Sequence, residues 1–259
     1  MKKIFLMLSL VIAFGFQSFG QKNNAKEDKE SGEYEIITEN RNVPQFENLN
    51  VTGRFRVVLH QTSSQTVSVV APDKYLEYVE TTVDHNALII KMKEPKKGED
   101  KNIFERFKTK YNDYLIRQPI EIHIGVNNLK QIVLDGASSV ETESAFEGKE
   151  LYINLSGASK ASLEYTLSDV SVVLSGASKL EMKGRAENFQ LEGSGAALCE
   201  TTNLKSKNVT ANLSGASKAE VFATDNFDAK LSGASTMICE GNPKEVRQTS
   251  SRASKIVIK

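Results

Sequence analysis

The sequence of 259 residues predicts an all-β fold, with a parallel β-helix, or solenoid, in the second half of the chain. A Gly-Ala-Ser phrase or a close variant recurs there at intervals of 21, 19, 19, 20, 18 and 19 residues. Residues on both sides of each copy alternate between apolar and polar with period two, as in half-buried strands, and helical spacing is absent from this block. Such regularity indicates equivalent coils stacked on one another.

Seven copies of the repeat align on one position, which is glycine in six copies and arginine in the last. Alanine follows this position in all seven copies. Glycine permits a positive φ or a close backbone approach, so the phrase predicts a tight bend, which we call the GAS corner. The aligned residues are Gly136, Gly157, Gly176, Gly195, Gly215, Gly233 and Arg252.

The flanks predict one strand before and one strand after each corner. Ile153 and Leu155 precede their glycine at four and two residues, whereas Leu180 and Met182 follow theirs at four and six. One unit cannot bury its apolar face, but units stacked at ~4.8 Å bury a continuous column. A propeller needs blades of ~40 residues and a leucine-rich repeat needs a helical segment, so both fit less well.

Two arrangements of the corner side chains remain open. If the alternation continues through the corner, its serines point inward and must hydrogen-bond along the stack. If the corner resets the alternation, alanine points inward and serine outward, and the presence of alanine in every copy favours a tight site. The serines concerned are Ser159, Ser178, Ser217 and Ser235.

Residues 36–130 predict an N-terminal β region that precedes the repeat units of residues 131–259. Segments such as LNVTGRFRVVLHQ and IEIHIGV alternate or form β-branched runs. Pro72, in APDKYLEYVE, marks the first turn of a single helix. Residues 94–118 break the strand pattern and predict a surface insertion with a short helix.

The first residues predict export. Residues 1–20 combine two lysines, an apolar run and a small-residue exit, which is the pattern of a signal peptide. The run of about a dozen residues is shorter than the ~20 that span a bilayer, so we expect no transmembrane segment in the mature chain. Residues 21–35 are mostly polar and charged and predict a linker. The expected location is the periplasm, the outer membrane or the cell surface.

Overall charge excludes a broad class of ligands. The chain has 33 basic and 33 acidic residues, so no net field draws it to nucleic acid or to an anionic membrane. We therefore expect no nucleic-acid partner.

The order RNVPQFENLNVTGRFRVVLHQ, VSVVAPDKYLEYVETTVDHNALIIKMK, IEIHI, LKQIVLDGAS and a series of LSGAS units resembles the auto-transporter adhesin head GIN domain family. The resemblance covers roughly residues 38–259. It implies a right-handed parallel β-helix and an exported protein of the kind found in Bacteroidetes-type bacteria. It implies little chemistry, because the family has no established catalytic residues.

One row of charged residues is the candidate site. Lysine occupies the same place in four of the seven units, and glutamate recurs two residues later. Such a row is either a solvated face that discourages aggregation or a surface for an acidic envelope glycan or a protein partner. The residues of the row are Lys160, Lys179, Lys218 and Lys255, and the glutamates are Glu141, Glu181, Glu200 and Glu220.

Other chemistry is weakly represented. His60, His85 and His123 lie in separate β segments with no second ligand at metal-like spacing, so we expect neither a metal nor another cofactor. The chain has no Trp and its repeats have few aromatic residues, whereas glycan-cleaving β-helices need paired carboxylates and usually aromatic platforms. Cys199 and Cys239 lie two units apart, by ~9–10 Å along the stack, which is too far for a disulfide and predicts two buried free thiols.

These observations favour a non-enzymatic β-solenoid of the cell envelope that serves adhesion, surface binding or scaffolding. The alternative is a self-assembling structural protein or homo-oligomer, because the last strand, KIVIK, has no obvious cap. The degenerate seventh unit, with Ser250 and Arg252 in place of Leu and Gly, can itself serve as that cap. A glycan-cleaving β-helix is less well supported than either.

Overall fold

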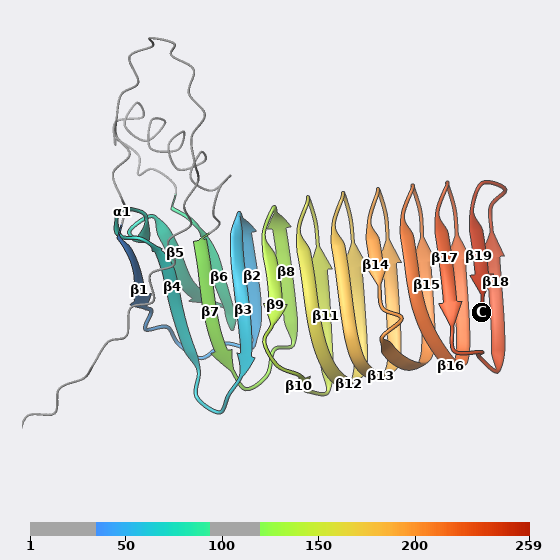
Figure 1. Ribbon diagram of the computed structural model, residues 1–259, viewed down its shortest axis with the longest axis horizontal. Coiled ribbons are helices and arrows are strands. Elements are labelled where there is room, and N and C mark those ends of the chain that lie inside the picture. Colours follow the sequence, from blue (N-terminus) through green and yellow to red (C-terminus); the bar gives the residue numbers. More distant parts are fainter. Residues whose placement is uncertain (1–34, 94–119) are drawn as a thin grey trace, which may run out of the picture. The chain divides into compact units, whose positions relative to one another are not determined.

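The computed structural model describes residues 35–93 and 120–259. These residues are nearly all β, with 67% strand and 2% helix, and form a solenoid of about seven turns (Figure 1). The predicted signal peptide (1–20), all but the end of the predicted linker (21–35) and the predicted insertion (94–118) lie outside the described residues. Within residues 35–93 and 120–259 no helix is long and apolar enough to cross a membrane.

Two facing sheets form the walls of the solenoid. We call the strands that follow the corner the post-glycine sheet and those that precede it the pre-glycine sheet. In stacking order the post-glycine sheet consists of β1 (Ile36–Asn40), β4 (Thr66–Pro72), β7 (Ile120–Val126), β3 (Phe55–Gln61), β9 (Ser139–Thr142), the first parts of β12 (Lys160–Leu174) and β13 (Lys179–Gly193), β14 (Leu198–Glu200), the first part of β16 (Lys218–Leu231), β17 (Thr236–Glu240) and β19 (Lys255–Ile258).

The pre-glycine sheet contains the other half of each coil. In stacking order it consists of β5 (Val79–Asp84), β6 (Ala87–Met92), β2 (Asn48–Gly53), β8 (Gln131–Gly136), β11 (Glu150–Leu155), the later parts of β12 and β13, β15 (Leu204–Leu213), the later part of β16 and β18 (Glu245–Ser250). The short β10 (Phe146–Glu147) pairs with β12 where the coil bends at its far side.

Equivalent positions of successive units lie side by side. β12 and β13 pair in parallel from Lys160 with Lys179 to Leu174 with Gly193, an offset of one repeat. Because side chains alternate between the two faces of a strand, this register keeps each repeat position on the same face in every coil. The predicted stacking of units is therefore confirmed.

The order of coils at the N-terminal end differs from their order in the chain. β2 pairs with both β6 and β8, and β3 pairs with both β7 and β9, so the coil made of β2 and β3 lies between two coils that come later in the sequence. β4 and β5 then run antiparallel to β7 and β6, and β1, paired antiparallel with β4, is the outermost strand on its side. The N-terminal β region thus continues the solenoid and also closes it.

The predicted helix is present but short. α1 spans Asp73–Leu76, and Pro72 is its N-cap residue. Tyr75 and Leu76 are buried, so this single turn joins β4 to β5 and packs against the end of the core.

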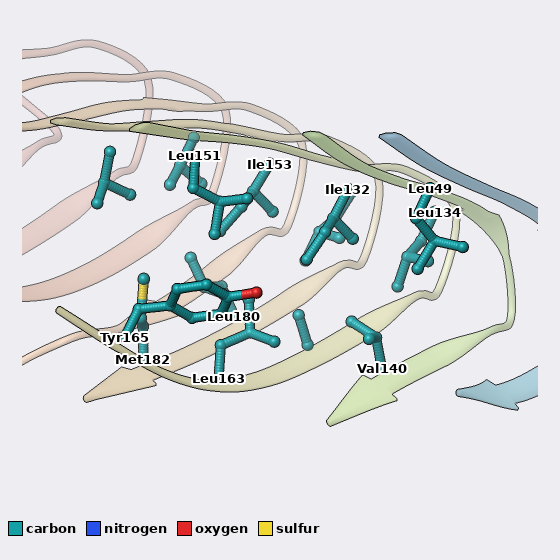
Figure 2. Close-up of a cluster of buried hydrophobic side chains, with 14 of the residues drawn as sticks. Leu49, Ile132, Leu134, Val140, Leu151, Ile153, Leu163, Tyr165, Leu180 and Met182 are labelled. Carbon is teal, nitrogen blue, oxygen red and sulfur yellow. The ribbon is translucent and has the colours of Figure 1, made fainter. Parts of the chain in front are cut away.

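The core fills the space between the two sheets (Figure 2). Ile132 and Ile153 extend from the pre-glycine sheet, while Leu163 and Leu180 extend from the post-glycine sheet. All four are at most 2% exposed. Each fully buried side chain of this size stabilises the fold by about 1.5–3 kcal/mol relative to an exposed one, so the continuous column holds the coils together.

Glycine is required at the corner for two reasons. Gly176 has a φ of 68°, and a Cβ placed on it would lie 2.7 Å from the carbonyl oxygen of Gly157 in the preceding coil. The amide of the following Ala177 donates to the same oxygen at 2.8 Å. Equivalent alanine-to-glycine bonds join Ala137 to Gly53, Ala158 to Gly136, Ala196 to Gly176, Ala216 to Gly195 and Ala234 to Gly215. We call this series the corner ladder.

Serine, not alanine, points inward at the corner. Ser159 is 0% exposed, and its hydroxyl donates to the backbone carbonyl of Ser156 at 2.8 Å, within the same corner rather than along the stack. Ser217 and Ser235 donate in the same way to Ser214 and Ser232. The corner alanines are exposed, so their recurrence reflects the backbone contact of the ladder and not a tight internal site.

The seventh copy departs from the other six. Arg252 does not have a positive φ, and no alanine amide bonds to Gly233 from this coil. The hydroxyl of Ser251 donates to the Gly233 carbonyl instead, at 3.2 Å. The corner ladder therefore ends one coil before the last one.

A second ladder, not foreseen in the sequence, follows the far side of the coils. Asn188 donates to Asp169 at 2.8 Å, Asn208 donates to Asn188 at 2.9 Å, and Asn226 donates to Asn208 at 2.6 Å. Each asparagine side chain thereby donates a hydrogen bond to the side-chain oxygen at the same position of the preceding coil. The two ladders fix the coil register at both bends.

Replacing Gly176 with Ala should lower the free energy of unfolding by about 2–3 kcal/mol, because a Cβ meets both the strained φ and the Gly157 carbonyl. Urea denaturation followed by circular dichroism measures this loss. Ala177→Ser, at the exposed neighbouring position, is the matched control and should change stability by less than about 0.5 kcal/mol. Equal losses in the two variants would contradict the role of the ladder.

Candidate functional site

The four predicted lysines lie on the outer side of the post-glycine sheet. Strand register puts them in one row, in the order Ser139, Lys160, Lys179, Leu198, Lys218, Thr236 and Lys255. Lys160 and Lys179 are direct neighbours, whereas Leu198 and Thr236 separate the others. Like charges therefore meet at only one step of the row.

Two of these lysines form ion pairs with glutamates of the adjacent row. Lys179 Nζ lies 2.9 Å from Glu200 Oε2 and also pairs with Glu181 in its own strand. Lys218 pairs with Glu220. Hydrogen bonds to Glu181 and Glu200 raise the pKa of Lys179, so this ammonium group stays charged throughout the physiological range. Among the described residues, Lys160 and Lys255 form no ion pair.

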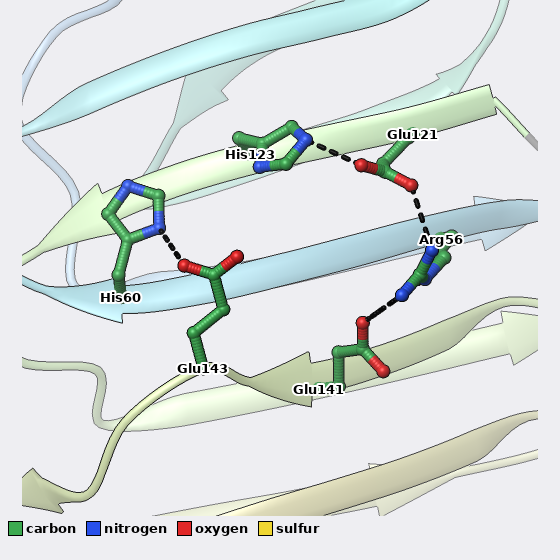
Figure 3. Close-up of polar contacts among 6 residues, drawn as sticks. All are labelled: Arg56, His60, Glu121, His123, Glu141 and Glu143. Carbon is green, nitrogen blue, oxygen red and sulfur yellow. Dashed lines mark hydrogen bonds and ion pairs between the residues drawn. The ribbon is translucent and has the colours of Figure 1, made fainter. Parts of the chain in front are cut away.

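A network around Arg56 extends the charged face to the N-terminal coils (Figure 3). Arg56 is the neighbour of Ser139 in the register, so it belongs to the lysine row. Its Nη1 lies 3.0 Å from Glu121 Oε2 in β7, and its Nε donates to Glu141 Oε1 in β9 at 3.1 Å. Hydrogen bonding to Glu141 raises the pKa of Arg56. One guanidinium group thus links three neighbouring strands.

The sequence did not predict that Arg56 belongs to the lysine row, because its strand precedes the repeats by a long stretch of chain. The available signal was Gly53, which pairs with Gly136 and is followed three residues later by Arg56, at the spacing of Gly176 and Lys179. The coil of β2 and β3 therefore carries an eighth corner, in the sequence VTGRF.

His123 and His60 lie beside this network (Figure 3). His123 Nε2 lies 2.6 Å from Glu121 Oε1, and His60 Nδ1 lies 3.7 Å from Glu143 Oε2. His85 occupies the turn between β5 and β6 with a φ of 47°. Within residues 35–93 and 120–259 no group of three or more His, Cys, Asp or Glu residues is placed to hold a metal ion.

A hollow of 350 Å³ on the charged face gathers carboxylates from three coils. Glu181, Glu200 and Glu220 line it together with Thr142, Ser162, Lys183 and Asn203. The acid of a glycosidase pair needs an apolar pocket that keeps one carboxyl group protonated, whereas these carboxylates are partly exposed and paired with lysines. The arrangement fits recognition of hydroxyl and charged groups rather than acid–base catalysis.

A second hollow, of 420 Å³, lies on the pre-glycine side of the corner. Gly193 stands there at the inward position that Leu174 and Leu213 occupy in adjacent coils. The walls include Glu192, Lys230 and a row of corner serines. This mixture of leucines, hydroxyls and opposite charges does not select one class of ligand.

The two cysteines are buried and unbridged, as the spacing of the repeats predicts. Burial raises the pKa of the Cys199 thiol to about 12 and that of Cys239 to about 11. Such thiols are inert at neutral pH because the reactive thiolate is absent.

Residues 45–243 match the family model described as "Putative auto-transporter adhesin, head GIN domain". The chain belongs to this family. Membership in an adhesin family fits a surface module that carries out no chemistry. The match ends just before β18, so the last coil of this head GIN protein lies outside the matched residues.

Solved structures share the fold of this head GIN protein. A putative adhesin from Bacteroides fragilis has a TM-score of 0.75 at 19% identity, over 87% of this chain and 97% of that one. A putative adhesin from Parabacteroides merdae gives 0.67 at 15%, over 88% and 98%. A putative lipid binding protein from Parabacteroides distasonis gives 0.63 at 16%, over 86% and 96%. No curated protein matches the chain.

Replacing Arg56 with Gln should lower the free energy of unfolding by about 1 kcal/mol, because Glu121 and Glu141 lose the cation between them. The loss should shrink at high salt, which screens exposed charges. Chemical denaturation at two salt concentrations measures it. Arg54→Gln is the matched control, since Arg54 is exposed and forms no ion pair with the described residues. Equal effects of the two substitutions would argue against the network.

Both thiols should resist alkylation in the native protein at pH 8, because burial removes access and raises the pKa of each thiol. Intact-mass measurement after iodoacetamide treatment should show no added group before denaturation and two groups after it. Rapid labelling of the native protein would show that the coils open at Cys199 or Cys239.

Proposed function

We propose that this protein is an exported, non-enzymatic binding module of the cell envelope, and that its charged post-glycine face binds an acidic envelope glycan. The observation that carries the proposal is a row of cations at one repeat position on the outer side of the post-glycine sheet. The row consists of Arg56, Lys160, Lys179, Lys218 and Lys255.

The repeat supports a polymeric ligand. Coils stack at about 4.8 Å, so the row offers charged groups at fixed multiples of this spacing along a straight line. A linear polysaccharide likewise presents carboxylates and hydroxyls at regular intervals, and several weak contacts along one chain add to a useful affinity. The neutral interruptions at Leu198 and Thr236 limit repulsion within the row.

The glutamates favour selectivity over nonspecific attraction. The Lys179 ammonium group lies between Glu181 and Glu200 and donates hydrogen bonds to both, which orders a long flexible side chain before a ligand binds. The glutamates also leave the face nearly neutral overall, so an anionic membrane is a poorer ligand than a polymer that offers hydroxyls as well as carboxylates.

Export and a role without catalysis rest on separate grounds. The predicted signal peptide and the adhesin family support an exported or surface location. The ion-paired state of the carboxylates in the 350 Å³ hollow supports binding without cleavage.

The double variant Lys179→Glu/Lys218→Glu should bind a uronic-acid polysaccharide such as alginate at least about tenfold more weakly than the unchanged protein at low salt. Biolayer interferometry with immobilised alginate measures the change. Lys149→Glu/Lys230→Glu is the control, because it alters the net charge equally at exposed positions away from the row. The proposal fails if both variants bind alike or if the unchanged protein ignores the polymer. Release of reducing ends from the alginate would contradict the non-enzymatic role.

A further inference from the structure

The C-terminal end of the solenoid has two strands with a free edge. β18 pairs with β16 and β19 pairs with β17, and no other strand of residues 35–93 and 120–259 pairs with either. An unpaired edge presents a row of backbone donors and acceptors that another strand can satisfy.

The side chains that point inward at this end are also uncovered. Val246 is 42% exposed, whereas Phe227 at the same position of the preceding coil is 1% exposed. Ile258 is 39% exposed, whereas Cys239 beneath it is buried. One more layer on this end would complete the apolar column.

The opposite end of the stack cannot supply that layer in the same way. There β4 and β5 run antiparallel to the strands beside them, and α1 joins the two across the end of the core. At that end α1 buries Tyr75 and Leu76 over the core, whereas Val246 and Ile258 are uncovered at the C-terminal end, which favours a contact between two C-terminal ends.

A two-fold axis along the strand direction makes the C-terminal end complementary to itself. Residues at equal distances before and after Arg252 lie opposite each other across the core, because both strands leave the corner with the same rise per residue. Rotation about this axis lays β18 of one copy antiparallel to β19 of the other. The register then places Val246 opposite Ile258, Gln248 opposite Ile256, and Ser250 opposite Ser254.

The outward residues match in the same register. Glu245 lies opposite Lys259 of the second copy, Thr249 lies opposite Lys255, and Arg247 lies opposite Val257. A two-fold axis perpendicular to the sheets would instead pair β19 with itself, and centring on Val257 would bring Lys255 against Lys259. Directly opposed like charges destabilise a strand pair, so the axis along the strands is favoured.

We infer that two copies of this chain join through their last coils as a closed symmetric dimer, in which β18 of each copy pairs with β19 of the other. The two solenoids then share one continuous core. Because the post-glycine sheet of one copy continues into the pre-glycine sheet of the other, their charged faces point to opposite sides.

The molar mass of the purified protein, measured by light scattering over a range of concentrations, should approach that of two chains. Val257→Lys and Val257→Glu form a matched pair at one outward position opposite Arg247. The lysine variant should dissociate at least about tenfold more readily than the glutamate variant, because two symmetric contacts each oppose like charges. Adding Arg247→Glu to Val257→Lys should restore the dimer.

A cysteine pair tests the register directly. In one copy Arg247 and Val257 lie on opposite outer faces, so Arg247→Cys/Val257→Cys can form a bridge only between copies. Mild oxidation should give a covalent dimer, and Arg247→Cys alone should give far less. A protein that stays monomeric at all concentrations overturns the inference, as does growth into open chains. A dimer that is insensitive to the charges at positions 247 and 257 also overturns it.

Discussion

The hydrogen bond from six of the seven corner alanines to the glycine carbonyl of the preceding coil is the contact on which the rest of the structure depends. It requires a backbone approach that leaves no room for a Cβ. A Cβ on Gly176 would lie only 2.7 Å from the carbonyl oxygen of Gly157. Once this approach is made, the coil spacing is set at one bend, and the asparagine ladder from Asp169 to Asn226 sets it at the other. Two sheets held at both bends have little freedom to slip.

Fixed register explains why one repeat produces both the core and the charged face. A slip of one residue in either sheet would turn the leucines outward and the lysines inward, and burying unpaired ammonium groups costs far more than any corner bond supplies. The inward serine fits this scheme because Ser159 satisfies its hydroxyl on its own corner and needs nothing from neighbouring coils. Coils can therefore vary, as the fourth does with Ala197, without losing the stack.

Much of this architecture could be predicted from the repeats, because a fixed period, alternating flanks and a corner glycine act locally. The interleaving of β2 and β3 between later coils could not, since it depends on which distant edges pair, and local pattern is silent on that. Arg56 could not be assigned to the lysine row for the same reason, although Gly53 precedes it at the spacing found in the repeats. The asparagines were overlooked because they look like turn residues one at a time and become a ladder only when stacked.

The two ends of the described stack differ in how far their core is covered. At the N-terminal end, antiparallel strands and α1 cover the core. The Gly-Ala-Ser phrase is absent from the sequence of these elements. At the other end the phrase persists in weakened form: Gln248 and Ser250 replace apolar residues, yet Val246 and Ile258 remain and are exposed. A cap selected only for solubility would have replaced these two as well. Their retention beside polar neighbours is typical of a surface that meets a partner of limited extent.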